Sequence, residues 1–368
     1  MQILTVIGAR PQFIKAAVVS KALRERPGLN EFLVHTGQHF DLNMSGIFFE
    51  QMGIAKPDAN LGISGGSHAE MTGEMLVQIE RLIIQTKPHV VLVYGDTNST
   101  LAGALSAAKL CCPVAHVEAG LRSDNRKMPE EINRIITDHV SDLLFAPTED
   151  SIRTLIQEGI PTTKIVRTGD VMLDASLLFG ELAGKNSKIM HELELEEKKF
   201  ALCTFHRAEN VDHPETLEWI VKGLTQVAER TEVVIPMHPR TRQRMNSFGL
   251  MEEISKSAKV CAPLGYLDIL QLEKHSSIIL TDSGGIQKEA FFNRVPCVTL
   301  RTETEWKELL SGGHNRLAVP LEDSIVEKFT QAQESDCDWS VDLYGNGKSS
   351  STIVDALSEN YGPNEPVL

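Results

Sequence analysis

Two kinds of hydrophobic pattern alternate along the chain. Short continuous apolar runs such as VVLVYG are typical of strands buried on both faces, whereas segments with an apolar residue about every three to four positions are typical of amphipathic helices. In the first half the pattern predicts strands at 2–7, 31–36, 89–94, 113–117, 142–146 and 164–168, and helices at 11–25, 43–52, 68–86, 98–110, 130–140 and 149–158. Such an alternation predicts a parallel sheet covered by helices.

A second series of the same kind follows. It predicts strands at 199–205, 232–237, 258–262, 277–281, 297–300 and 316–319, and helices at 214–229, 240–247, 266–274, 285–293, 304–311 and 322–333. The 368 residues exceed the roughly 250–300 that one core usually reaches. The chain therefore predicts an α/β protein of two Rossmann-like, doubly wound domains, 1–170 and 171–350. The terminal segment 351–368, with a helix over 351–361, is expected to cross back to the first domain.

Composition and charge exclude several classes of protein. No apolar stretch approaches the roughly 18 residues that span a bilayer, and the start MQILTVIG indicates a first strand instead of a signal peptide. The net charge is −14 and the basic residues are dispersed, which argues against nucleic-acid binding. The six cysteines form no CxxC pair and indicate buried thiols, without a metal site or a disulfide frame. These features favour a cytoplasmic enzyme or binding protein.

Ligands of open α/β sheets bind beyond the carboxyl ends of the strands, and two such sheets facing each other would leave a cleft there. After the first strand, GARPQFIK places Arg10 and Lys15 where a helix begins. After the third, Asp96 of YGDTNST is either a helix N-cap or a site residue. Glu118 of HVEAGLRS ends an apolar strand, where a carboxylate is costly unless it has a ligand or a partner.

The helix that follows begins PEEINR. Its first turn holds Glu130 and Glu131, which the helix dipole would favour even without a catalytic role. In the second half, the strand FALCTF runs into His206, which is either a structural histidine or an acid/base group opposite the carboxylates. The alternatives stay open at this stage.

The segment TDSGGIQKEA favours a phosphate site. Ser283, Gly284 and Gly285 follow Asp282 at the start of a helix, where amide groups can approach a phosphate because glycine lacks a Cβ atom. Glu289, one turn later, is either an acceptor for ribose hydroxyls or an exposed helix residue. No P-loop and no GxGxxG motif is present, so a sugar linked to a nucleoside diphosphate is the expected ligand.

Taken together, these motifs resemble those of the non-hydrolysing UDP-N-acetylglucosamine 2-epimerases. The resemblance runs in family order through GARPQFIK, HTGQH, YGDTNST, HVEAGLRS, PEEINR, FHRAEN, TDSGGIQKEA and TETEW. It implies a glycosyltransferase-B-like architecture, a homodimer, and reversible inversion at C2 of the sugar without a cofactor. The implied route eliminates UDP to give a glycal and adds it back from the other face.

The resemblance also implies the roles of individual residues. The implied catalytic residues are Asp96, Glu118, Glu130 and His206. The residues implied to bind the UDP part of the substrate are Arg10, Lys15, Ser283, Gly284, Gly285 and Glu289.

Two segments depart from the best-known members of the family. TETEWKE has Trp306 where TERPE has an arginine, as in the subgroup that acts on UDP-2,3-diacetamido-2,3-dideoxy-glucuronate for surface polysaccharides such as O-antigen. FDLNMS follows GQH, where members with an allosteric site carry a different stretch. The substrate is therefore expected to be this uronate or UDP-N-acetylglucosamine. A UDP-sugar transferase and an inert UDP-sugar sensor are the alternatives.

Overall fold

The computed structural model describes residues 1–38 and 56–362, so the helix predicted at 43–52 lies outside the described residues. The chain divides into two compact units: Met1–Leu178 with Asp342–Leu368, and Phe179–Val341. Each unit is described by itself. The division falls inside helix α7 (Val171–Asn186), whereas the sequence placed a boundary near residue 170, at the start of this helix.

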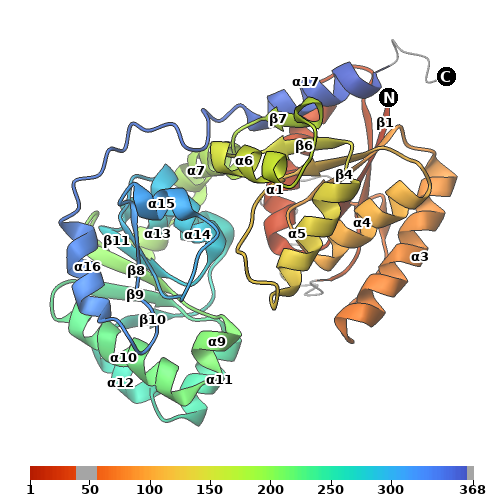
Figure 1. Ribbon diagram of the computed structural model, residues 1–368. Coiled ribbons are helices and arrows are strands. Elements are labelled where there is room, and N and C mark those ends of the chain that lie inside the picture. The colour runs from red at the N-terminus through yellow and green to blue at the C-terminus, as the bar shows by residue number, and fades with distance from the viewer. Residues whose placement is uncertain (39–55, 363–368) are drawn as a thin grey trace. The chain divides into compact units, whose positions relative to one another are not determined.

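The first unit contains one parallel sheet in the order β3-β2-β1-β4-β5-β6-β7 (Figure 1). Its strands are β1 (Gln2–Ile7), β2 (Asn30–His35), β3 (Ala59–Asn60), β4 (Val90–Tyr94), β5 (Val114–Val117), β6 (Leu143–Ala146) and β7 (Ile165–Arg167). Its helical segments are α1 (Arg10–Arg24), α3 (His68–Thr86), α4 (Asn98–Lys109), α5 (Pro129–Val140), α6 (Glu149–Gln157), the 3-10 turn η1 (Thr162–Lys164) and α17 (Ser349–Tyr361), with the first part of α7.

The second unit repeats this plan with a parallel sheet in the order β10-β9-β8-β11-β12-β13. Its strands are β8 (Phe200–Thr204), β9 (Glu232–Pro236), β10 (Lys259–Cys261), β11 (Ile278–Thr281), β12 (Cys297–Thr299) and β13 (Asn315–Leu317). Its helices are α8 (Ile189–Glu192), α9 (Ala208–Val211), α10 (Pro214–Ala228), α11 (Pro239–Ser247), α12 (Met251–Ser257), α13 (Tyr266–His275), α14 (Gly284–Phe292), α15 (Lys307–Ser311) and α16 (Ile325–Gln333). The predicted α/β class with two doubly wound parallel sheets is confirmed.

Strand order positions the polar loops. In each sheet the direction of winding reverses beside the first strand, between β1 and β4 in the first unit and between β8 and β11 in the second. Loops that leave such a pair of strands diverge and open a crevice at their carboxyl ends. The segments GARPQFIK and YGDTNST follow β1 and β4, and FHRAEN and TDSGG follow β8 and β11.

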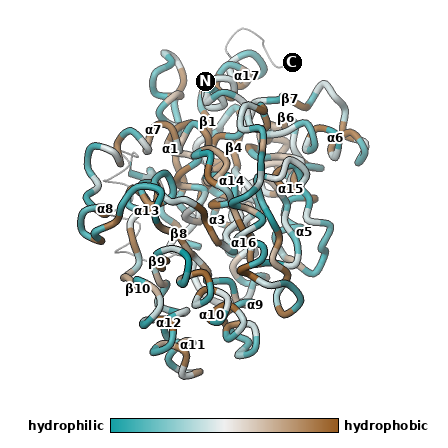
Figure 2. Tube along the Cα trace, turned by 90° about the vertical axis from the view of Figure 1, so that its left-hand side faces the viewer, coloured by the Kyte–Doolittle hydropathy of each residue, from teal (hydrophilic) through white to brown (hydrophobic). Residues whose placement is uncertain are grey.

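The strands form the cores because helices cover both faces of each sheet. Every residue of β4 and β8 is buried, and in Figure 2 strand β8 is brown while the segment around α8 is teal. Helix α4 packs closely on its sheet at Gly103, where an added Cβ atom would lie 2.9 Å from a methyl group of Val93. No helix in the described part of the chain is long and apolar enough to cross a membrane.

The terminal helix α17 belongs to the first unit, beside the N-terminal elements in Figure 1. Asp174 of α7 accepts hydrogen bonds from the backbone amides of Ser349 and Ser350, at 3.1 and 2.7 Å. These amides belong to the first turn of α17 and have no hydrogen-bond partner within the helix. Asp355 of α17 pairs with Arg26, which follows α1. These contacts fasten the terminal segment to the elements that begin the chain.

Candidate active site

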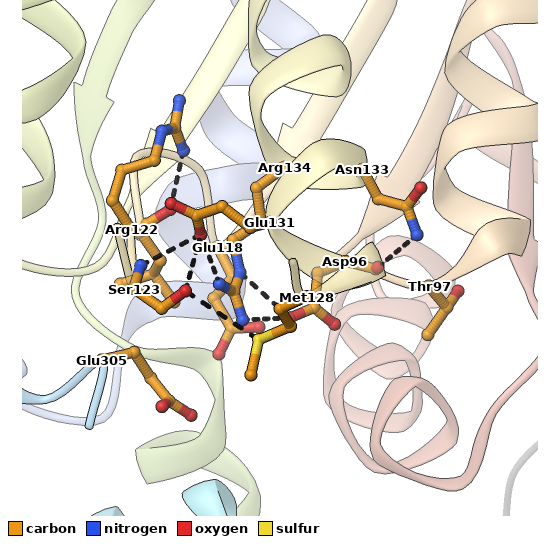
Figure 3. A network of polar contacts seen from close by, with 12 residues as sticks. Asp96, Thr97, Glu118, Arg122, Ser123, Met128, Glu131, Asn133, Arg134 and Glu305 are labelled. Atoms are coloured by element: carbon orange, nitrogen blue, oxygen red, sulfur yellow. Dashed lines mark hydrogen bonds and ion pairs between the residues drawn. The ribbon is translucent and has the colours of Figure 1, made fainter. Parts of the chain in front are cut away.

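Asp96, at the carboxyl end of β4, is held by two consecutive residues of α5 (Figure 3). Arg134 donates from Nε and Nη2 to the same Oδ2 atom, at 3.0 and 2.7 Å, and Asn133 donates to the backbone oxygen of Asp96 at 2.9 Å. The Asp96 side chain stays 32% exposed. Its orientation is therefore fixed while part of the carboxylate remains open to a ligand.

The adjacent glutamates of α5 have different environments. Glu131 is buried and accepts hydrogen bonds from the amides of Ser123 and Asp124, from the Ser123 hydroxyl and from Arg134. Burial opposes ionisation of Glu131, but the hydrogen bonds outweigh it and lower its pKa. Glu130 is exposed and has no hydrogen bond or ion pair within the described part of the chain. Glu131 thus has a structural role, whereas the carboxylate of Glu130 is accessible to a substrate.

Glu118, at the end of β5, forms an ion pair with Lys15 of α1, and both side chains are nearly buried. Lys15 is the partner that a carboxylate at the end of an apolar strand requires. Glu118 has a φ of 72°, in the left-handed region that non-glycine residues seldom adopt. Gly95 makes room for the pair, since a Cβ atom there would lie 3.2 Å from Oε2 of Glu118. Arg10 begins α1, and its side chain lies outside the described parts.

A buried network lies beneath these loops. The two ring nitrogens of His116 each lie 2.7 Å from an acceptor, Oδ1 of Asp138 and the backbone oxygen of Gly95. Because the Asp138 carboxylate and the carbonyl oxygen only accept, both nitrogens of His116 donate. Burial opposes ionisation of Asp138, but His116 and Arg122 outweigh it and lower the pKa of this carboxyl. The network fixes the turn immediately before Asp96.

In the second unit, His206 and Asp282 follow the neighbouring strands β8 and β11. Oδ2 of the fully buried Asp282 accepts hydrogen bonds of 2.9 Å from the amides of His206 and Arg207 and from Nδ2 of Asn210. Nδ1 of His206 lies 3.6 Å from the other oxygen, Oδ1, and the imidazole is half exposed. The histidine is therefore carried by a rigid loop with its ring accessible.

The N-terminus of α14 has the features of an anion site. Ser283 is the N-cap, its hydroxyl makes no capping hydrogen bond, and the helix begins at Gly284. A Cβ atom at Gly284 would clash with Oε1 of Glu305, whereas a Cβ atom at the exposed Gly285 would lie in ordinary contact, 3.9 Å from the hydroxyl oxygen of Ser283. The first amides of a helix have no partner within it, so this end can donate to a phosphate.

Glu289, one turn further along α14, is buried, so the alternative that it is an exposed helix residue is wrong. It accepts a hydrogen bond of 2.7 Å from the hydroxyl of Tyr266. Glu273 of α13 is fully buried nearby, and neither of its carboxylate oxygens has a hydrogen-bond partner in the described structure. Burial, and then the charge of Glu289, raise the pKa of Glu273 well above its usual value.

The loop containing TETEW is attached to α14. Nζ of Lys288 lies 4.1 Å from the ring centroid of Trp306, a cation–π contact, and both residues are buried. The hydroxyl of Thr304 donates to Oε1 of Gln287 at 2.7 Å. The helix predicted at 304–311 is consequently shorter and begins at Lys307, because these contacts hold the preceding residues in an extended loop.

Sequence reasoning missed two residues that organise the site, Arg134 and Asp282. The spacing of Glu131 and Arg134, three positions apart on a predicted helix, could have indicated that they share a face. The sequence named Asp282 only as a member of TDSGGIQKEA, and its contacts had no local signal because its partners lie more than 70 residues earlier in the chain.

Comparison with known proteins decides the family. The model of the UDP-N-acetylglucosamine 2-epimerase family matches residues 21–358. The chain belongs to this family. It is 52% identical to UDP-2,3-diacetamido-2,3-dideoxy-D-glucuronate 2-epimerase of Pseudomonas aeruginosa, over 98% of this chain and 100% of the relative.

Solved structures agree with this membership. A crystal structure of the Methanocaldococcus jannaschii UDP-GlcNAc 2-epimerase with UDP-GlcNAc and UDP is 42% identical, with a TM-score of 0.90 over 98% of this chain and 100% of the other. That of the Neisseria meningitidis UDP-GlcNAc 2-epimerase bound to UDP-GlcNAc is 32% identical, with a TM-score of 0.87 over the same shares. The resemblance, the glycosyltransferase-B-like architecture and the isomerase class are confirmed.

Proposed function

We propose that this family member inverts C2 of UDP-2,3-diacetamido-2,3-dideoxy-glucuronate. The main support for this substrate is the 52% identity to the Pseudomonas aeruginosa enzyme, which covers nearly all of both chains. The identity to the Methanocaldococcus jannaschii UDP-GlcNAc 2-epimerase is 42%. The buried Trp306 supports it, because TETEW resembles the loop of the diacetamido-uronate subgroup. UDP-N-acetylglucosamine is the second candidate, since the solved relatives bind it.

The reaction needs acid/base groups on both faces of the sugar. No carbonyl acidifies the C2 proton, so its removal is coupled to cleavage of the bond between C1 and the UDP oxygen. The products are a glycal, UDP and a protonated base. Re-addition of UDP to C1, with protonation of C2 from the opposite face, completes the inversion.

We assign this proton transfer to Asp96, Glu118, Glu130 and His206. Arg134 orients Asp96, and Lys15 orients Glu118. Glu130 is exposed, and the imidazole of His206 is half exposed. Glu131 is excluded from the assignment because its oxygens already serve Ser123, Asp124 and Arg134.

UDP is assigned to the start of α14. The backbone amides at Gly284 and Gly285 and the hydroxyl of Ser283 would bind the diphosphate, and the carboxylate of Glu289 would accept from the ribose hydroxyls. Arg10 and Lys15 supply positive charge that would stabilise the departing diphosphate. Lys15 has a second effect, because its ammonium neutralises Glu118 when this residue is ionised.

We further propose a cytoplasmic homodimer that serves the synthesis of surface polysaccharides such as O-antigen. The cysteines are free thiols, which supports a reducing compartment, although only Cys203 and Cys297 are buried and the expectation of buried thiols is wrong for the other four. The helix α3 carries two exposed apolar residues seven positions apart, Val77 and Ile84, which lie on one side of the helix and provide a surface for a second copy.

The experiment that tests the function compares the two UDP-sugars side by side. The protein is incubated with UDP-2,3-diacetamido-2,3-dideoxy-glucuronate or with UDP-N-acetylglucosamine, and the C2 epimer is followed by proton NMR. We expect a kcat/KM at least about 10²-fold higher for the uronate than for UDP-N-acetylglucosamine. A site with polar groups that bind the substituents of the uronate would leave those groups unpaired when the smaller sugar binds. A preference for UDP-N-acetylglucosamine contradicts the proposed substrate, and transfer of sugar to an acceptor contradicts the proposed reaction.

A further inference from the structure

The two oxygens of Asp282 have different environments. Oδ2 accepts three hydrogen bonds of 2.9 Å, two from backbone amides and one from the side chain of Asn210, and these fix the plane of the carboxylate. Oδ1 is buried and makes no hydrogen bond in the described structure. The group that faces it is Nδ1 of His206, at 3.6 Å.

A buried carboxylate oxygen without a hydrogen bond is costly, so the approach of the His206 ring nitrogen to this oxygen calls for an explanation. A distance of 3.6 Å is longer than a hydrogen bond, but such contacts often lengthen in the absence of substrate and tighten in its presence. The rigid element is Asp282, and the ring of His206 is half exposed and able to turn. A small rotation of the imidazole would complete the contact.

We propose that Asp282 is a positioning residue that holds His206 in the tautomer with the proton on Nδ1, so that Nε2 faces the substrate as the proton-exchanging atom. The proposal rests on the proposed function, in which His206 is an acid/base group. A neutral imidazole has one nitrogen that donates and one that accepts, and the hydrogen bond of the first decides which atom is free for chemistry. Asp282 contributes through His206 and does not itself exchange a proton with the sugar.

Two neighbouring groups in the described structure, His238 and Arg207, do not offer this contact. The ring of His238 lies 6.1 Å away between centroids, and Arg207 is directed to Glu209 at 3.6 Å. Neither Arg207 nor His238 supplies an anionic acceptor to Nδ1. Asp282 is the carboxylate that the structure places at this nitrogen.

The test replaces Asp282 with asparagine. The amide oxygen of Asp282→Asn can still accept from the three donors, while its NH₂ group faces Nδ1 and favours a proton on Nε2. We expect kcat to fall by about 10²–10⁴-fold, as when a triad aspartate becomes asparagine, with KM changed by less than about three-fold. The matched control Asn210→Ala removes one of the three supporting hydrogen bonds and leaves Oδ1 in place, so kcat should fall by less than about ten-fold.

A second measurement does not depend on turnover. Nitrogen-15 NMR of the full chain at about pH 8, with UDP bound and with His206→Asn for assignment, reports which ring nitrogen of His206 carries the proton. We expect protonated Nδ1 in the unmodified protein and protonated Nε2 in Asp282→Asn. A proton on Nε2 in the unmodified protein overturns the proposal even if the variant does not fold. Absence of epimerase activity with a proton on Nδ1 contradicts the proposed function and leaves the Asp282 contact established.

Discussion

Arg134 donates from Nε and Nη2 to a single oxygen of Asp96 and from Nη1 to Oε2 of Glu131. One guanidinium thus joins the loop after β4 to the first turn of α5. A lysine cannot reproduce this, because an ammonium presents a compact charge without the planar array of donors.

Arg134→Lys should therefore leave Asp96 poorly oriented. We expect a loss in kcat/KM of about 10²-fold and a decrease of about 2 kcal/mol in the free energy of unfolding, from lost hydrogen bonds to charged groups. Arg153→Lys, at an exposed arginine of α6 that pairs with Asp150, is the matched control and should change neither quantity measurably. Equal effects of the two variants on kcat/KM would contradict the role of Arg134.

The adjacent glutamates of α5 should respond in opposite ways. Glu130→Gln removes an exposed acid that has no partner among the described residues, so turnover should fall by at least about 10²-fold with the melting temperature unchanged. Glu131→Gln removes the charge that accepts from Ser123, Asp124 and Arg134, and should lower the free energy of unfolding by about 2 kcal/mol. Thermal unfolding and the NMR epimerisation assay on both variants check this. Full activity of Glu130→Gln would remove that residue from the mechanism.

Glu273 should make stability depend on pH. Its pKa is raised in the folded protein, so the folded state binds the proton more tightly than the unfolded state, whose pKa is about 4.3. The contribution of Glu273 to the free energy of unfolding is therefore complete below the unfolded pKa. It is lost as pH rises through the folded pKa, at up to about 1.4 kcal/mol per pH unit. Glu273→Gln keeps the shape and removes the titration.

Urea unfolding of both proteins at about pH 5, 6 and 7 measures this difference. The unmodified protein should lose stability relative to Glu273→Gln across the series. Parallel stabilities would show that Glu273 is not a buried neutral acid.

The homodimer is tested on α3. Val77 and Ile84 are 51% and 56% exposed, and a charge at both positions would oppose burial in an interface. We expect the unmodified protein to be a dimer by light scattering and Val77→Asp/Ile84→Asp to be a monomer with an unchanged melting temperature of the folded chain. Ile156→Asp on α6, at a position 46% exposed, is the control and should remain dimeric. A dimeric double variant would exclude this face as the interface.

The sequence predicted elements whose signal is local. The runs ILTVI, VVLVY and IILT became β1, β4 and β11 because a strand covered on both faces must be continuously apolar. It did not predict α7, because the segment LAGKNSKIMHELELEEKKF, which begins within this helix, was interpreted as a charged approach to the second sheet. It also did not predict the two-residue strand β3.

For the site, the sequence predicted that polar residues lie at the ends of strands, but it did not predict which of them pair with one another. Lys15 meets Glu118 across 103 positions, and Asp96 meets Arg134 across 38. Such pairs depend on which strands are neighbours, and the strand order is set by packing of the whole sheet. The roles of the two glutamates of PEEINR also depend on burial, which a first-turn position alone does not decide.

The central claim is that acid/base side chains of this protein remove the C2 proton and return a proton from the opposite face of the sugar. Deuterium incorporation tests it most directly. The unmodified protein is incubated with UDP-2,3-diacetamido-2,3-dideoxy-glucuronate in deuterated water, and the recovered UDP-sugars are analysed by NMR. The account predicts deuterium at C2 of both epimers and at no other carbon. Product that keeps its protium at C2 would contradict it.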